Sequence, residues 1–267
     1  MTVNTLAIER PEPGIAVVCL QREAKLNALD ATLMAELTAA AEHMRDEAGL
    51  KAVVLTGGRR MFSAGVDLAT FELARTGTDE AAARQAIEPG RRLIEAWAEL
   101  PMVTIAAVEG GAVGGGFGLT LACDWRVYAQ DAWASVPEVK LGLTYGWGLL
   151  PRLAALVGPS RAKWMATLGR RHPCTELQQW GLVDQATLPG EALPTALALA
   201  REVAALPGLA LRQVKRAVDA DTQALFSAAS HRDVDDMLAG LADVEGTRVR
   251  ERTLRELAGG YGQKKST

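Results

Sequence analysis

The sequence is poor in cysteine, histidine and aromatic residues, and the first two shortages exclude particular kinds of site. The three cysteines, Cys19, Cys123 and Cys174, are far apart and odd in number, so they form neither a disulfide framework nor a CxxC metal clip. A free thiol in an apolar run such as VVCL packs as a small hydrophobic group, which favours a reducing compartment. The three histidines lack the spacing of metal ligands.

Neither positive charge nor hydrophobicity is concentrated in one part of the chain. The net charge is −3 and the isoelectric point about 5.8, so no basic surface for nucleic acid is expected. The N-terminus has no basic start followed by an apolar stretch, which predicts no signal peptide. No uncharged apolar run reaches the length of a membrane span. These absences predict a cytoplasmic protein with no nucleic-acid or membrane partner.

Short apolar runs alternate with longer helical patterns along the 267 residues. Apolar runs of this length are typical of strands buried on both faces of a sheet. Strands separated by helices indicate right-handed crossovers and a mainly parallel sheet, and therefore an α/β fold. The expected strands are Ile15–Leu20, Lys51–Thr56, Met102–Val108, Asp124–Ala129 and Ala132–Val136.

Helical periodicity dominates the C-terminal third, so we expect a core over residues 1–190 and a helical region over 191–267 that packs on the core. Apolar stripes on those last helices predict an oligomer interface. The polar segment 70–90 predicts a mobile loop with a short helix, and Asp30 is expected as a helix N-cap. The expected helices are Asp30–Ala48, Ala154–Leu168, Glu176–Gly181, Ala192–Leu206, Leu209–Asp221, Leu225–Leu241 and Asp243–Leu257.

Two stretches containing glycine follow predicted strands. MFSAGVDL at 61–68 follows strand 51–56, and EGGAVGGGFG at 109–118 follows strand 102–108. Small residues at strand ends let a ligand approach the backbone closely. The second stretch predicts a helix over Gly115–Cys123, whose free N–H groups would face the ligand. One N–H group from each stretch would form an oxyanion hole. The glycine run alone is a weak signal, and a dinucleotide site lacks the acidic residue it requires.

Four motifs in the same order resemble the crotonase (enoyl-CoA hydratase/isomerase) family over nearly the whole chain. They are LNAL at 26–29, FSAGVDL at 62–68, VEGGAVGGGFGLTLACDWR at 108–126 and VPEVKLGL at 136–143. The resemblance implies a crotonase-like spiral of ββα units followed by C-terminal helices. It also implies acyl-CoA substrates, no metal or organic cofactor, and assembly as a homotrimer or a dimer of trimers.

The same resemblance implies roles for individual residues. The N–H groups of Ala64 and Gly115 would bind the thioester oxygen, and Glu138 would move the proton. Asp67 has a second interpretation as a helix N-cap, and the aromatic pair at 145 and 147 would either line the acyl pocket or pack beneath the turn. The residues expected around coenzyme A and the acyl group are Ala24, Leu26, Ala28, Ala64, Asp67, Leu68, Gly111, Gly115, Tyr145 and Trp147.

One departure from the family pattern bears on the reaction. Many hydratases of the family hold a water between two glutamates, and the place of the first is taken here by Gly118. Glu138 alone suffices to move a double bond, and burial between apolar neighbours would raise its pKa. The pattern therefore favours a 3,2-enoyl-CoA isomerase. A second carboxylate from the polar segment stays open as an alternative, with four candidates: Glu72, Asp79, Glu80 and Glu88.

Other functions also stay open. They are enoyl-CoA hydration with a different second group, another CoA-thioester reaction (hydrolysis, decarboxylation or dehalogenation), and a non-catalytic scaffold or RNA-binding relative. The acidic isoelectric point argues against the last. Arg170, Arg171 and Lys215 are candidate partners of the coenzyme A phosphates, and His172 is expected in a loop.

Overall fold

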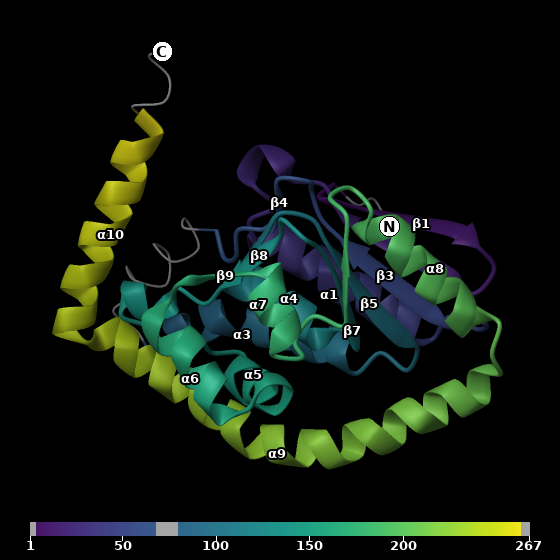
Figure 1. Ribbon diagram of the computed structural model, residues 1–267. Helices are drawn as coiled ribbons and strands as arrows, with labels where there is room; N and C mark the ends of the chain where they lie inside the picture. Colours follow the sequence, from purple (N-terminus) through teal and green to yellow (C-terminus); the bar gives the residue numbers. More distant parts are fainter. Residues whose placement is uncertain (1–3, 68–79, 263–267) are drawn as a thin grey trace.

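The strands of the computed structural model form two sheets (Figure 1). The structure describes residues 4–67 and 80–262, apart from the side chains of 80–83, 221–232 and 257–262. The strands are β1 (Leu6–Glu12), β2 (Ile15–Leu20), β3 (Ala52–Thr56), β4 (Met61–Ser63), β5 (Val103–Val108), β6 (Gly111–Val113), β7 (Trp125–Ala129), β8 (Trp133–Ser135), β9 (Arg171–Pro173) and β10 (Gln185–Thr187).

The chain winds as a spiral between these sheets. The large sheet has the order β1-β2-β3-β5-β7-β10 and the small sheet the order β4-β6-β8-β9. Each consecutive pair, β3–β4, β5–β6 and β7–β8, places its first strand in the large sheet and its second in the small one. Neighbours are parallel except β1–β2 and β8–β9. This arrangement confirms the predicted spiral of ββα units.

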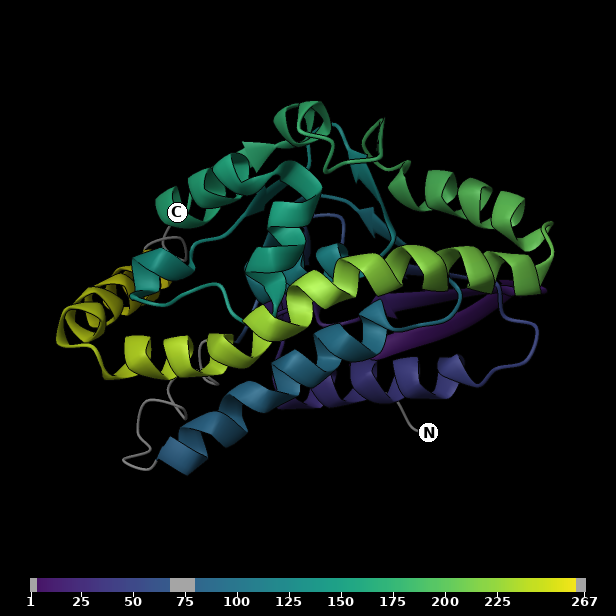
Figure 2. The ribbon, with the colours of Figure 1, turned by 90° about the horizontal axis from the view of Figure 1, so that it is seen from below.

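Helices cover both faces of the large sheet. They are α1 (Ala31–Arg45), α3 (Glu80–Ala98), α4 (Gly115–Ala122), α5 (Leu149–Val157), α6 (Pro159–Leu168), α7 (Cys174–Gln179), α8 (Ala192–Ala204), α9 (Gly208–Ala242) and α10 (Val244–Gly262), with short 3-10 helices η1 (Glu23–Lys25) and η2 (Glu138–Leu141). Helix α8 lies across one face of the large sheet (Figure 1), and α9 runs beneath the molecule against α3 and α5 (Figure 2).

Alternation along the strands divides the apolar residues into two cores. In β3, Ala52 and Val54 face α8, whereas Val53 and Leu55 face the larger core between the sheets, α1 and α3. All four side chains are completely buried. Strands buried on both faces lose the alternation of polar and apolar residues, so they read as continuous apolar runs in the sequence.

Several predicted elements differ from the observed ones. The first strand, β1, was not predicted, because residues 9–12 are Glu, Arg, Pro and Glu rather than an apolar run, and three of them are exposed. The helix expected over 154–168 is two helices, broken where Gly158 has a φ of +80° and Pro159 begins α6. The two helices expected over 209–241 are one, α9, because residues 222–224 include no glycine or proline.

The part of the chain expected to be a loop with a short helix is partly described. Residues 68–79 lie outside the described part, whereas α3 forms a 19-residue helix from Glu80. His172, expected in a loop, lies in β9, where it pairs with Ala134 of β8. Asp30 is an N-cap as predicted, because its carboxylate accepts a hydrogen bond of 2.9 Å from Leu33 N–H.

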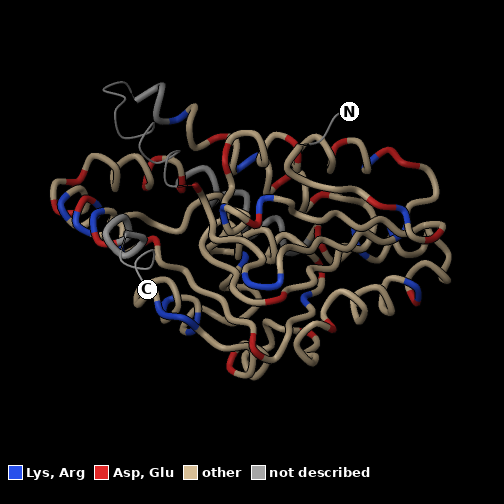
Figure 3. Tube along the Cα trace, turned by 90° about the horizontal axis from the view of Figure 1, so that it is seen from above, with Lys and Arg blue, Asp and Glu red and all other residues tan. Residues whose placement is uncertain are grey.

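Basic and acidic residues are scattered along the trace rather than gathered by sign, and long stretches carry no charge (Figure 3). Over the described ranges, a single helix with the length and apolarity of a membrane span is absent; α8 and the start of α9 meet the criterion only together, with a bend of 110° between them. Within the same ranges, no group of three or more histidine, cysteine or carboxylate side chains is placed to hold a metal ion.

Candidate active site

Three predicted functional segments follow three neighbouring strands of the small sheet. Ala64 follows β4, Gly115 follows β6, and Glu138 follows β8. The three strands are adjacent and parallel in the order β4-β6-β8, so their carboxyl ends meet at one edge. The glycine stretches were predicted to follow the strands that are β3 and β5, because the three-residue strands β4 and β6 were not predicted. The candidate site therefore lies at the edge of the small sheet rather than of the large one.

The backbone of Gly115 is open to a ligand. It is the first residue of α4, a position whose N–H group has no acceptor within the helix. Over the described part of the chain, the Gly115 N–H group makes no hydrogen bond to protein. A Cβ atom added to Gly65 would lie 3.5 Å from this nitrogen, so the two glycine stretches touch here. The helix dipole favours negative charge at this point.

The second predicted donor is already engaged. The N–H group of Ala64 donates to Leu26 O over 2.9 Å. Leu26 and Asn27 both have left-handed backbone conformations, with φ of +53° and +51°. This hydrogen bond joins the 22–29 segment to the strand-end turn. A ligand oxygen that reaches Ala64 has to replace the Leu26 carbonyl.

Glu138 points into the same region. A Cβ atom on Gly114 would lie 2.5 Å from its Oε1 atom, so the carboxylate rests against the backbone that leads to Gly115. Its Oε2 atom is buried and has no partner among the described residues, although part of the residue is accessible. Desolvation by this burial raises the pKa of Glu138 from 4.5 to about 8, against a smaller lowering by its own backbone N–H. A carboxyl group in this state exchanges protons near neutral pH.

An apolar pocket opens beside Glu138 and Gly115, and we call it the acyl pocket. Its volume is about 600 Å³ including the part open to solvent. Glu138 is the one carboxylate among the described residues that line it. The other lining residues come from four segments: Val66; Ala86 and Ile87; Leu143–Trp147 and Leu149; and Met237 and Leu241. Apolar walls with a single buried carboxylate are typical of a small-molecule site.

Leu149 occupies the space that a side chain at position 118 would need. A Cβ atom on Gly118 would lie 2.4 Å from Leu149 Cδ1 and 3.1 Å from Cδ2. Leu149 is 1% exposed and begins α5. The position of the missing glutamate is therefore filled by hydrocarbon rather than by water.

The remaining predicted site residues fall into three groups. Ala24, Leu26 and Ala28 lie in the 22–29 segment, whose Arg22 bonds the Ala28 carbonyl and pairs with Asp30 over 2.8 Å and Asp67 over 3.6 Å. This segment adjoins the site through the Leu29–Val66 bridge. Leu68 lies outside the described residues. Gly111 is at the far end of β6, against Trp133, and does not line the acyl pocket.

Tyr145 and Trp147 both line the acyl pocket, which is the first of the two predicted alternatives. Tyr145 is buried, and its hydroxyl donates to Gly114 O over 3.1 Å. Burial also raises the pKa of Tyr145 well above its usual value.

The three basic residues predicted to bind the coenzyme A phosphates have partners within the protein. Lys215 donates to Asp124 Oδ2 over 2.6 Å and is almost fully buried. Its positive charge is therefore paired with that carboxylate rather than offered to a coenzyme A phosphate. Arg171 stacks 4.0 Å above the Trp133 ring and Arg170 lies 5.9 Å from the Trp164 ring. None of the three lines the acyl pocket.

Nine wall residues were not predicted from the sequence: Val66, Ala86, Ile87, Leu143, Thr144, Gly146, Leu149, Met237 and Leu241. Met237 and Leu241 stand one turn apart on α9, a spacing that gives them one face of the helix. That spacing predicts an apolar face without saying which pocket the face covers. Leu149 carries no local signal of its contact with Gly118, which is 31 residues away.

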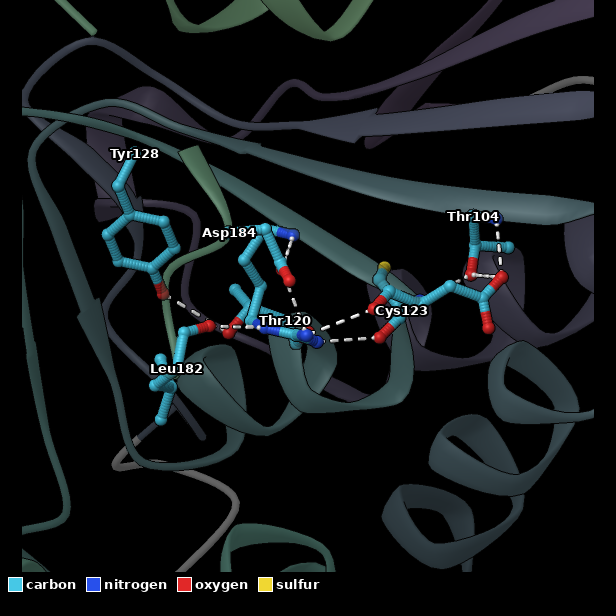
Figure 4. Close-up of polar contacts among 8 residues, drawn as sticks. Thr104, Thr120, Cys123, Tyr128, Leu182 and Asp184 are labelled. Carbon is cyan, nitrogen blue, oxygen red and sulfur yellow. Dashed lines mark hydrogen bonds and ion pairs between the residues drawn. The ribbon is translucent and has the colours of Figure 1, made fainter. Parts of the chain in front are cut away.

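The end of α4 opposite Gly115 is fixed by a buried guanidinium. Arg126 donates to Leu182 O over 2.7 Å, to Cys123 O over 2.8 Å and to Asp184 Oδ2 over 3.0 Å. Figure 4 shows Leu182, Cys123 and Asp184 in this network, beside the contact between Thr120 and Tyr128. The guanidinium thus satisfies the carbonyl groups at the end of the helix whose start carries the open N–H group.

Loss of this guanidinium should destabilise the fold strongly. We expect Arg126→Ala to lower the free energy of unfolding by about 2–6 kcal/mol, because the buried carbonyl groups of Leu182 and Cys123 lose their donor at about 1–3 kcal/mol each. Asp184 keeps the backbone N–H of residue 126 as a donor. Urea unfolding followed by circular dichroism measures the change. Arg45→Ala is the control: Arg45 forms an exposed pair with Glu99, which is worth about 1 kcal/mol or less. Equal effects of the two substitutions would contradict the structural role.

Comparison with known proteins identifies the family. The family model described as enoyl-CoA hydratase/isomerase matches residues 10–245. A probable enoyl-CoA hydratase, EchA17, of Mycobacterium avium is 34% identical over 209 residues, which are 78% of this chain and 79% of the relative. A mevalonyl-coenzyme A hydratase of Beauveria bassiana is 36% identical over 68% of this chain and 66% of the relative.

Solved structures give the same result. The crystal structure of an enoyl-CoA hydratase/isomerase from Xanthobacter autotrophicus superposes with a TM-score of 0.85 at 29% identity, over 95% of this chain and 94% of that one. The shared spiral and the family match over most of the chain show an enzyme of this kind, and the chain belongs to the enoyl-CoA hydratase/isomerase family.

Proposed function

We propose that this enzyme is a 3,2-enoyl-CoA isomerase in which Glu138 is the single acid/base group. The observation that carries the proposal is the contact between Gly118 and Leu149. A hydratase of the two-glutamate type needs a water held between two carboxylates. Here one carboxylate is missing and an apolar side chain fills its space, so Glu138 has no second carboxylate in the described wall with which to hold a water.

The proposed reaction requires only internal proton transfer. Glu138 removes a proton from C2 of a 3-enoyl-CoA, and the electron pair moves into the thioester to give a dienolate. The developing negative charge lies on the thioester oxygen, within reach of the Gly115 N–H and, once Leu26 O is displaced, of Ala64 N–H. Glu138 then returns the proton to C4. Atoms and electrons balance without a metal, an organic cofactor or water.

The raised pKa of Glu138 fits a group that accepts and returns one proton. The base form has to be present at the start of the cycle, so kcat/KM is expected to rise with pH and level off above about 8, the pKa of the free enzyme. Initial rates with a 3-enoyl-CoA from pH 6 to 9.5 measure this profile. A rate that is flat across this range would separate Glu138 from the rate-limiting proton transfer.

The decisive experiment compares two substrates. The purified protein is given 3-hexenoyl-CoA and, separately, 2-hexenoyl-CoA, and products are identified by chromatography. Isomerisation of the first without hydration of the second is the expected result. Hydration of 2-hexenoyl-CoA without isomerisation would reject the proposal in favour of a hydratase.

The hydratase remains the second candidate, because the names of the relatives favour it. It needs a second polar group to position water. Glu88 pairs with Arg91 and does not line the acyl pocket. Glu72 and Asp79 lie outside the described residues, and the side chain of Glu80 is likewise not described.

A further inference from the structure

Trp147 has a backbone conformation that is unfavourable for a residue with a side chain. Its φ is +62°, in the left-handed region, and the following Gly148 has a φ of +71°. Such conformations persist only where neighbouring structure holds them, and they cluster at functional sites. We therefore expect contacts from neighbouring elements to hold the turn Gly146–Trp147–Gly148 in this conformation.

Helix α9 holds both ends of this turn. The carboxylate of Asp233 accepts a buried hydrogen bond of 2.7 Å from Gly148 N–H. Met237, one turn further along α9, fills the space beside Gly146, where an added Cβ atom would lie 2.2 Å from its sulfur. The conformation of Trp147 thus depends on two contacts with a helix about 85 residues away in the sequence.

The indole ring of Trp147 is wedged between α3 and the first residue of α4. A Cβ atom on Gly115 would lie 2.5 Å from Trp147 Cζ3, and one on Gly90 would lie 2.0 Å from Cζ2. The indole N–H is buried and meets no acceptor among the described residues. A hydrogen bond of that N–H group therefore does not account for the position of the ring.

We propose that Trp147 restricts the acyl pocket to acyl groups that are unbranched near the thioester, and that Asp233 is its positioning residue. The inference rests on the proposed function, since it takes Gly115 N–H as a donor to the thioester oxygen. That contact fixes the carbonyl carbon, and the next carbons begin one or two bonds away. The ring lies against Gly115, so it adjoins these carbons, and a branch there meets its edge.

Binding measurements test the proposal without any turnover. Isothermal calorimetry is done with butanoyl-CoA and 3-methylbutanoyl-CoA, which differ by one methyl group. A methyl group in a tight pocket changes recognition by about 10–200-fold. We expect the native protein to bind butanoyl-CoA at least about tenfold more tightly, and Trp147→Ala to reduce this ratio to within about threefold. Trp164→Ala, at a tryptophan that is 52% exposed on α6, should leave the ratio unchanged.

Asp233 is tested by two substitutions. Asp233→Ala removes the acceptor of Gly148 N–H and should shift the ratio in the same direction as Trp147→Ala. Asp233→Asn keeps an oxygen at that place and should restore the native ratio. A general loss of stability would lower the affinity for both ligands and for coenzyme A alone, and would leave the ratio where it was.

The outcomes separate this inference from the proposed function. An unchanged ratio in Trp147→Ala overturns the inference even where isomerisation is observed. A shifted ratio supports it even where the protein proves to be a hydratase. If Trp147→Ala does not fold, Trp147→Phe gives the same comparison with a smaller ring, and an unchanged ratio in a folded Trp147→Phe also overturns it.

Discussion

Replacing Glu138 by glutamine is expected to lower kcat for 3-enoyl-CoA isomerisation by about 10²–10⁴-fold, the usual contribution of a positioned acid/base group. Glutamine has nearly the same shape and cannot take up the C2 proton. The KM for the substrate should change little, because the oxyanion donors and the acyl pocket are untouched. Rates with 3-hexenoyl-CoA measure both values. Full activity in Glu138→Gln would remove the catalytic assignment.

The same substitution has an effect on stability whose sign follows from the pKa. Glu138 has a pKa of about 8 in the folded protein and 4.5 as its ordinary value. The stability that its protonated form contributes is fully present below pH 4.5 and is lost as the pH rises through 8. Glu138→Gln should therefore be more stable than the native protein at pH 9, by on the order of a few kcal/mol.

Thermal unfolding at pH 5 and pH 9 separates this effect from misfolding. A gain of stability at pH 9 together with a loss of activity assigns the loss to chemistry. Glu42→Gln is the matched control, because Glu42 is exposed on α1 and does not line the acyl pocket. Neither its activity nor its pH dependence of unfolding should differ from those of the native protein.

Restoring the second carboxylate requires two substitutions at once. Gly118→Glu alone places atoms within 2.4 Å of Leu149 Cδ1, so it should cost about 1–3 kcal/mol by overpacking and give no hydration. Leu149→Ala alone leaves a cavity and should cost about 2–5 kcal/mol. In the double variant Gly118→Glu/Leu149→Ala, the glutamate side chain fills the space that the leucine side chain has left. We expect this variant to hydrate 2-hexenoyl-CoA at a measurable rate, and we expect no hydration by the native protein.

The control for this gain is Gly118→Gln/Leu149→Ala. It has the same shape and cavity but carries no second carboxylate. Hydration by the glutamate variant alone supports the explanation of the native site as a one-carboxylate site. Equal hydration by both variants would show that space, rather than the missing acid, limits the native enzyme.

Much of the fold was predictable because local patterns and global structure agree. The apolar runs of β2, β3 and β5 are buried on both faces, and the 3.6-residue period of α1 is carried by buried residues such as Leu33, Leu37 and Met44. The motif order predicted that Ala64, Gly115 and Glu138 would meet. What failed depends on tertiary contact: β4 and β6 have three residues each, too few for a periodic signal.

The shape of the acyl pocket was not predictable for the same reason. The sequence shows that position 118 has no carboxylate. Only the packing of α5 shows that the Leu149 side chain fills the space beside this glycine. The conformation of Trp147 is similarly imposed from α9, by a hydrogen bond to Asp233. Contacts between residues this far apart have no periodic trace in the sequence.

The hydrogen bond between Ala64 N–H and Leu26 O makes ligand binding an exchange of acceptors. The unliganded protein has no unsatisfied donor at Ala64, so an incoming thioester oxygen gains only the difference between two carbonyl acceptors there. An enolate oxygen, which carries a full negative charge, is a much stronger acceptor than an amide carbonyl. The exchange therefore subtracts the same cost from binding of the reactant and of the anion, so it weakens reactant binding and leaves unchanged the preference for the anion that favours the chemical step.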